Sequence, residues 1–337
     1  MKRRHSTHAW THSVRWGACG FVLLLAASGA GCHRPATAAG ESGRKVDFSR
    51  EDWSFGGAKG AKLTSQHYIL YTTCASKPLV DAMPGFLESC YLAYRELLPG
   101  EIPPDRKLET YLFQSRWHWE RFTEQFSPQR ADIYKKIRAG GYSERGVTVS
   151  HYTGHKTSLS ILAHEGFHQF AEATRGANIP AWLNEGLACY FESFDLDPRT
   201  SRPLFSPETN YLRMRNLREA YVAGQLIPLE RILGTHAGIE VQEPGAHVRS
   251  YYAQVWSLVL FLNQRSLWNP YRSRFEKLLR EVGTEAMDRS ARAYLAANPE
   301  SGLSYGEAVF RAYIEDDLPK FQRAYDAYLR DLLRLAA

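Results

Sequence analysis

Cysteine is scarce in this sequence, with 5 among 337 residues, so a small fold that depends on disulfides is excluded. Internal repeats are absent, and the apolar stretch from Gly20 to Ala30 is too short for a permanent transmembrane helix. What the chain does have is 44% hydrophobic and 13% aromatic residues, enough to bury a sizeable core. We therefore expect one large or two modest domains.

Acidic residues are missing from the first 31 positions, where four basic side chains precede the apolar stretch. This arrangement is typical of an export signal, so residues 1–31 are predicted to be a signal peptide. The four basic residues of this segment account for most of the formal charge of +6, because the remaining chain has 38 basic against 36 acidic residues. Such a small excess gives no electrostatic footprint for nucleic acid, and we expect no nucleic-acid partner.

Two processing routes are open. The Ser-Gly-Ala-Gly-Cys run at 28–32 resembles a bacterial lipoprotein box, which would attach a lipid to Cys32, whereas Ala36-Thr37-Ala38 suits an ordinary signal peptidase. Either route predicts an exported protein of the bacterial cell envelope, with membrane contact only through a lipid at Cys32. Residues 32–60 contain few large apolar side chains, so they are predicted to be a flexible tether, and order should begin near Lys62.

Three cysteines remain after the tether. A disulfide between Cys74 and Cys90 would suit an oxidising compartment and would leave Cys189 unpaired. Alternatively all three are buried thiols, since free cysteine packs as a small apolar residue.

The apolar pattern divides residues 61–337, expected to form the folded domain, into two parts. Strands at 67–73, 108–113 and 147–152, separated by helices at 79–98 and 117–126, predict an α/β part with a small sheet over about 61–177. A mostly helical part should follow over about 178–337, so the expected class is α+β. A helix at 157–175 is expected to close the first part. The helices of the second part are expected at 180–193, 209–223, 251–264, 270–282 and 304–335.

The helix expected at 157–175 contains His164-Glu165-Gly166-Phe167-His168. Side chains four residues apart lie on one face of a helix, so both imidazoles can reach one ion at about 2.0–2.1 Å. Glu165 points elsewhere but borders the same cavity, where a metal-bound water would lie. A second helix carries Trp-Leu-Asn-Glu-Gly at 182–186, and Glu185 on this antiparallel partner would complete a three-ligand site open to water.

Together, His-Glu-x-x-His and Trp-Leu-Asn-Glu-Gly resemble the motifs of the gluzincin zinc metallopeptidases. More loosely, the chain looks like uncharacterised bacterial peptidase-like domains of the same clan. The resemblance implies a zincin-like fold with an active-site helix. It also implies a Zn²⁺ ion held by His164, His168 and Glu185, with Glu165 as the catalytic general base.

Two features of that clan are missing. The Gly-x-Met-Glu-Asn element with which the large aminopeptidases capture a substrate amino terminus is absent, which favours an endopeptidase that acts on proteins or peptides. Cys189 stands where thermolysin-type enzymes have an aspartate. A histidine ligand must then be oriented from elsewhere, and Glu192 is one candidate, with a solvated helix face as its alternative role.

In such a mechanism zinc lowers the pKa of its water to about 7, and Glu165 takes the proton. A further donor should stabilise the charge that develops on the carbonyl oxygen. In gluzincins this donor is a Tyr or His outside the ligand motifs. We expect Tyr252 to be this donor, with Tyr251 and His247 as alternatives. The other interpretation is that these tyrosines only pack in the core.

The strand before the active-site helix is expected to be an edge strand, Val147 to Ser150, that pairs with the substrate backbone. His151 and His155 lie nearby and are alternative ligands, although isolated histidines are more often solvated.

Two rival functions remain. A non-catalytic envelope binding protein could use the same scaffold, although every residue that hydrolysis needs is present. A structural zinc site usually has four protein ligands, often cysteines, and Cys189 is the only thiol near the motifs. We therefore expect an exported zinc-dependent peptidase.

Overall fold

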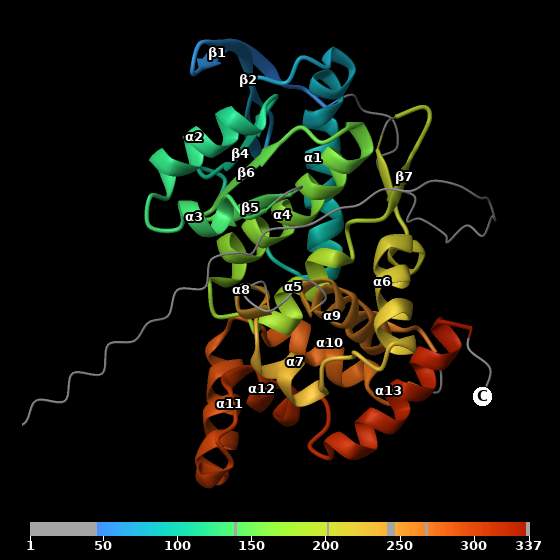
Figure 1. Cartoon of the computed structure of the whole chain (residues 1–337). Helices are drawn as coiled ribbons and strands as arrows, with labels where there is room; N and C mark the ends of the chain where they lie inside the picture. Colours follow the sequence, from blue (N-terminus) through green and yellow to red (C-terminus); the bar gives the residue numbers. More distant parts are fainter. Residues whose placement is uncertain (1–45, 138–139, 201, 241–246, 267–268, 335–337) are drawn as a thin grey trace, which may run out of the picture.

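The computed structural model describes residues 46–137, 140–200, 202–240, 247–266 and 269–334, and it has the α+β fold expected from the sequence (Figure 1). A sheet with helices on both faces forms the first part of the chain, and helices form the second. The strands are β1 (Ser49–Phe55), β2 (Ala58–Thr64), β3 (Tyr68–Thr72), β4 (Leu108–Phe113), β5 (Gly141–Glu144), β6 (Val147–His151), β7 (Phe194–Leu196) and β8 (Pro203–Phe205). The helices are α1 (Lys77–Leu97), α2 (Arg116–Phe126), α3 (Ala131–Tyr134), α4 (His155–Arg175), α5 (Ala181–Cys189), α6 (Tyr211–Val222), α7 (Leu229–Gly234), α8 (Ala237–Glu240), α9 (His247–Asn263), α10 (Arg272–Glu281), α11 (Glu285–Ala297), α12 (Tyr305–Tyr313) and α13 (Leu318–Leu332), with short 3₁₀ turns at Pro207–Thr209 and Pro299–Ser301.

The main sheet has six strands in the order β1-β2-β3-β4-β6-β5. Strands β3, β4 and β6 run parallel, while β1, β2 and β5 pair antiparallel with their neighbours. The expectation that Val147–Ser150 forms an edge is therefore wrong, because β6 lies between β4 and β5. The edge strand nearest α4 is β5, which was not predicted from the sequence.

Alternating side chains of the sheet pack into two cores. Leu70, Leu108 and Leu112 belong to the main core, which also contains buried residues of α1 and α4 and continues into the helical part. Phe113 and Val149 belong to a second, aromatic core beneath α2 and α3. Figure 1 shows these helix pairs on opposite sides of the sheet. Helix α4 is thereby enclosed between the sheet, α1 and the helical part.

Two contacts fix α4 in this position. The hydroxyl of Tyr94 on α1 donates to the Ala163 carbonyl at 2.6 Å, and a Cβ at Gly166 would lie 2.9 Å from that hydroxyl oxygen. Glycine at position 166 therefore lets α1 approach α4 closely. On the other side, the Gln169 amide donates to the carbonyls of Glu109 on β4 and Gly146 at 2.6 and 2.7 Å.

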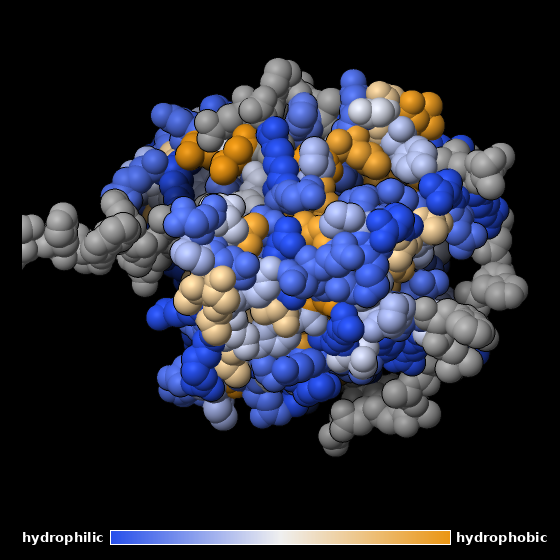
Figure 2. Space-filling view, turned by 90° about the horizontal axis from the view of Figure 1, so that it is seen from below, coloured by the Kyte–Doolittle hydropathy of each residue, from blue (hydrophilic) through white to orange (hydrophobic). Residues whose placement is uncertain are grey.

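Helix α9 is the centre of the helical part, and every residue from Ser250 to Leu262 is buried. Helices α5, α6, α7, α10 and α13 pack around it. Seen from below, the surface of this end of the molecule is mostly hydrophilic with separate apolar patches (Figure 2). None of the described helices is both long and apolar enough to cross a membrane.

Several sequence expectations need correction. Order begins well before Lys62, because β1 and β2 form a hairpin within the predicted tether, so a flexible segment up to residue 60 is wrong for residues 46–60. The helix expected at 304–335 is two helices, α12 and α13, and α11 was not predicted. Cys74, Cys90 and Cys189 are free thiols, so the expected disulfide is wrong; the alternative of buried thiols holds for Cys90 and Cys189, whereas Cys74 is only partly buried. The predicted signal peptide and Cys32 lie outside the described residues.

Candidate metal centre

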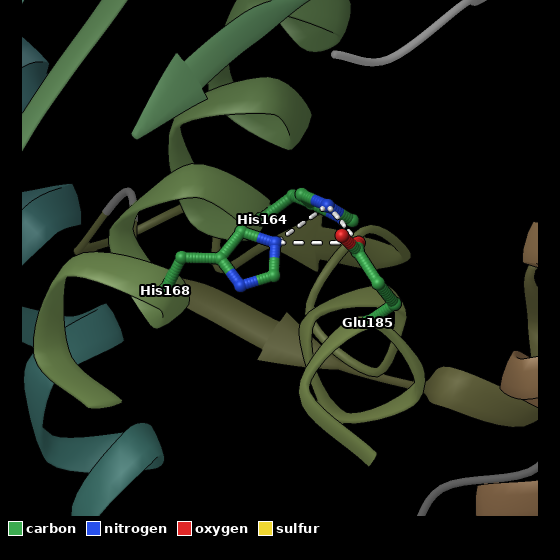
Figure 3. A group of neighbouring side chains, drawn as sticks. All are labelled: His164, His168 and Glu185. Atoms are coloured by element: carbon green, nitrogen blue, oxygen red, sulfur yellow. Dashed lines mark hydrogen bonds and ion pairs between the residues drawn. The ribbon is translucent and has the colours of Figure 1, made fainter. Parts of the chain in front are cut away.

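The side chains of His164, His168 and Glu185 meet in the interior, where α4 faces α5 (Figure 3). The two Nε2 atoms are 3.2 Å apart, and Glu185 Oε2 lies 3.4 Å from His164 Nε2 and 3.3 Å from His168 Nε2. These three atoms form a nearly equilateral triangle. The three residues proposed as ligands from the sequence are thus brought together by the fold.

The size of this triangle fits a tetrahedral ion. Ligand atoms at about 2.0–2.1 Å from zinc with tetrahedral angles are separated by roughly 3.3–3.4 Å. The observed separations of 3.2, 3.4 and 3.3 Å agree with that value. Three ligands leave the fourth tetrahedral position for a small molecule. His168 and Glu185 keep 4% and 8% of their side chains exposed and His164 none, so approach from solvent is on the side of the first two.

The second nitrogen of each histidine has its own carbonyl or carboxylate partner. His164 Nδ1 lies 2.8 Å from Glu192 Oε1, and His168 Nδ1 lies 3.1 Å from Asn184 Oδ1. An acceptor at Nδ1 holds the proton there and leaves the Nε2 lone pair free for a metal. Glu192 therefore orients His164, in the role of the aspartate of thermolysin-type enzymes, whose place is taken here by Cys189. The alternative role of Glu192 on a solvated helix face is excluded, because the residue is only 7% exposed.

The charges in the site favour a cation. Burial alone raises the pKa of Glu185, yet the neighbouring His168 and His164 lower it to about 2. Burial lowers the pKa of His164, but its hydrogen bonds with Cys189 and with the accepting carboxylates of Glu185 and Glu192 outweigh burial and raise that pKa. The carboxylates of Glu185 and Glu192 thus remain ionised, and this negative charge suits a cation.

Glu165 lies on α4 beside the ligands and is fully buried. Neither of its carboxylate oxygens has a hydrogen-bonding partner among the described residues. Burial raises its pKa to about 7, against the lowering effect of His164 and His168. Its Cγ lies 3.2 Å from where a Cβ of Gly141 would be, so the carboxylate is next to edge strand β5. A buried carboxylate without a protein partner is costly, which is typical of groups kept for chemistry.

Tyr252, the expected donor, lies beside the metal centre. Its ring meets that of His164 edge-on with centroids 6.1 Å apart, and the side chain is 2% exposed. Tyr251 packs against Tyr252, with ring centroids 5.7 Å apart. His247 is the first residue of α9, one turn before Tyr251. The ring contact with His164 places Tyr252 next to a proposed ligand.

Other potential ligands are less suitable. His164, Cys189 and Glu192 also form a buried cluster, but Glu192 already contacts Nδ1 of His164, and burial raises the pKa of the Cys189 thiol to about 11. A protonated thiol is a poor ligand at neutral pH. His151 is buried against Trp119, and His155 is exposed at the start of α4. Neither belongs to a metal-binding cluster found in the described part of the chain.

The sequence analysis missed three residues of this site. Asn184 precedes Glu185, and its place in the Trp-Leu-Asn-Glu-Gly run was the available signal. Asn210 and Arg213, at the start of α6, both donate to Glu192 Oε2, at 2.8 and 2.9 Å. No pattern indicated them, because an arginine early in an amphipathic helix usually lies on a solvated face.

A family described as Protein of unknown function (DUF1570) matches residues 158–282. This stretch contains all the residues of the metal centre. The comparison with curated proteins gave no match, and the comparison with solved structures gave none either.

Proposed function

We propose that this protein is an exported zinc-dependent peptidase that hydrolyses internal bonds of proteins or peptides. The observation that carries the proposal is the triangle of two imidazole nitrogens and one carboxylate oxygen, 3.2–3.4 Å apart, with a buried and unpartnered carboxylate next to it. Three protein ligands favour a catalytic ion over a structural one, which usually has four.

The residues have separate roles in this proposal. His164, His168 and Glu185 would hold a zinc ion, which would supply a lowered pKa for a bound water and polarisation of the substrate carbonyl. Glu165 accepts the proton of the attacking water and passes it to the leaving amine. Its raised pKa, about 7, suits a group that must both take and give a proton near neutral pH. Tyr252 donates to the carbonyl oxygen as negative charge develops there.

Edge strand β5 is the proposed site for the substrate backbone. It pairs with β6 on one side, and it is the last strand of the sheet on the other. An extended peptide added to this edge would lie next to Glu165, because Gly141 has no side chain between the strand and that carboxylate. A main-chain binding mode is compatible with cleavage inside a chain.

The proposed location is the bacterial cell envelope, with a lipid at Cys32 as the attachment to the membrane. The alternative is a non-catalytic binding protein on the same scaffold. The unpartnered carboxylate of Glu165 supports the enzyme over this alternative, because a binding protein has no need to keep a buried carboxylate without a partner.

The test uses the purified full chain, the variants Glu165→Gln and His168→Ala, zinc analysis and a quenched peptide library. Wild type should contain zinc and cleave peptides. Glu165→Gln should keep the zinc and lose about 100-fold or more of the activity, because the proton acceptor is gone. His168→Ala should lose both. Equal turnover by wild type and Glu165→Gln would remove the enzymatic proposal.

A further inference from the structure

We propose that Arg213 is a positioning residue of the metal centre, which fixes the carboxylate that orients His164 and at the same time holds the ring of Tyr252. This inference rests on the proposed function. Arg213 lies on α6, which follows the β7–β8 hairpin, so it comes from a different element than the proposed ligands on α4 and α5.

The first arm runs through Glu192. Arg213 donates from Nη2 to Oε1 at 2.8 Å and from Nε to Oε2 at 2.9 Å, which is a two-pronged ion pair. Oε1 also contacts His164 Nδ1 at 2.8 Å, and Oε2 accepts from the Asn210 amide at 2.8 Å. Each oxygen therefore has two partners, so the carboxylate cannot rotate away from His164.

The start of α6 fixes the position of the guanidinium. Asn210 is the N-cap residue, and its side-chain oxygen accepts from the Arg213 backbone N–H at 3.2 Å. The amide nitrogen of the same side chain donates to Glu192. One residue thus caps the helix that carries Arg213 and binds the carboxylate that Arg213 holds. This double use ties the helix start to the metal centre.

The second arm runs through Tyr252. The Arg213 Cζ atom lies 4.8 Å from the centre of the Tyr252 ring, within the range of a cation–π contact. Tyr252 in turn meets the ring of His164 edge-on. Arg213, Glu192, His164 and Tyr252 therefore form a closed loop of contacts, in which the orientation of a ligand and that of the proposed donor depend on one guanidinium.

Burial and charge explain why arginine is needed here. Arg213 is 2% exposed, so it does not reach a substrate, and a buried cation must be paired. The carboxylate of Glu192 supplies the negative charge that pairs with the guanidinium. Lysine would keep the charge, but it cannot make two parallel bonds to a carboxylate or stack its flat face on a ring.

The experiment compares Arg213→Lys with Arg215→Lys, a control two residues further along α6 whose side chain is 46% exposed. Zinc affinity is measured by chelator competition. The ligand geometry is followed in the visible spectrum of the Co²⁺-loaded protein, and kcat and KM are determined at saturating zinc. Arg213→Lys should bind zinc about 10- to 100-fold more weakly, change the cobalt spectrum and lower kcat at unchanged KM. Arg215→Lys should match wild type.

A second pair of variants tests the same role if Arg213→Lys does not fold. Glu192→Met removes the carboxylate that pairs with Arg213, whereas Glu192→Met with Arg213→Met replaces the buried ion pair by apolar side chains, an exchange that proteins often tolerate. If Arg213 acts on zinc through Glu192, the double variant binds zinc no more weakly than Glu192→Met. A further tenfold loss in the double variant would contradict the first arm.

The outcomes separate this inference from the proposed function. A wild-type protein that binds no zinc overturns both. A wild type that binds zinc and cleaves peptides, with a folded Arg213→Lys of identical zinc affinity and cobalt spectrum, overturns the role of Arg213 and leaves the peptidase intact.

Discussion

Gly186 on α5 lies directly against Val255 on α9: a Cβ at Gly186 would be 2.6 Å from the Val255 carbonyl oxygen. The same Cβ would be 2.4 Å from a methyl carbon of Val259. Both distances are too short for any side chain, so glycine is what lets the two helices touch. Because Glu185 precedes Gly186, this contact sets how far the ligand carboxylate reaches toward α4.

Gly186→Ala should therefore weaken both folding and metal binding. The added methyl group must push α5 from α9, which typically costs about 1–3 kcal/mol, and the shift moves Glu185 out of the ligand triangle. Denaturant unfolding of the metal-free protein and zinc competition measure the two effects. The control is Gly85→Ala on α1, where a Cβ meets nothing within 4 Å and should stabilise the helix by up to about 1 kcal/mol. Equal zinc affinity in Gly186→Ala and wild type would contradict the explanation.

The ligand set could be predicted from the sequence because helix geometry is local. The spacing of His164 and His168 puts both on one face of α4 whatever else the chain does. Glu185 was predicted as the third ligand because it lies on the next helix, which was expected to run antiparallel to α4. The orienting groups depend on tertiary packing: Arg213 lies 45 positions or more from either histidine in sequence and came with no signal of its own.

Fold class could also be predicted, whereas sheet edges could not. The apolar runs of β3, β4 and β6 are those of buried parallel strands, which sequence patterns reveal well. Strand β1 is largely exposed, and the β1–β2 hairpin contains charged residues and glycines, which is why its sequence resembles a flexible tether. Strand β5 has four residues and begins at the second glycine of a Gly-Gly pair, a pattern typical of a turn. The error over the edge strand followed from missing β5.

Asn184→Ala should weaken zinc binding about tenfold, and Asn184→Asp should not. Asn184 Oδ1, 3.1 Å from Nδ1 of His168, holds the tautomer whose Nε2 points at the metal. Alanine removes the acceptor, whereas aspartate keeps an acceptor oxygen and adds negative charge near the ion. Zinc competition on both variants tests this. If alanine and aspartate lower the affinity equally, packing rather than the hydrogen bond explains the role of Asn184.

Cys32→Ser should release the protein from membranes. Lipidation of this cysteine would anchor the chain, so wild type expressed in bacteria should partition into detergent and the variant should remain in the aqueous phase. Cys74→Ser, which changes a free thiol inside the fold, is the matched control and should partition as wild type does. Aqueous partitioning of wild type itself would reject the lipid and favour ordinary signal-peptidase cleavage.

His151 should make the fold sensitive to mild acid independently of the metal. Its ring is 6% exposed and packs on Trp119, and Nδ1 has no hydrogen-bonding partner among the described residues. Burial, reinforced by the positive charge of Arg116, lowers its pKa from 6.5 to about 4. The unfolded chain therefore binds a proton at a pH where the folded chain does not.

The direction of the pH dependence follows from this difference in proton binding between the unfolded and folded chains. Stability should be complete above about pH 6.5 and fall as the pH drops toward 4, since protonation then favours the unfolded state. At about pH 5 the loss from this one group is about 2 kcal/mol. Urea unfolding of wild type and His151→Gln, both with chelator present, at about pH 7.5 and about pH 5 measures it. The variant cannot titrate at this position, so its stability should fall by about 2 kcal/mol less than that of wild type. Parallel losses in the two proteins would mean that His151 is protonated in the fold, with its charge accommodated beside Glu120, the neighbouring carboxylate that raises its pKa.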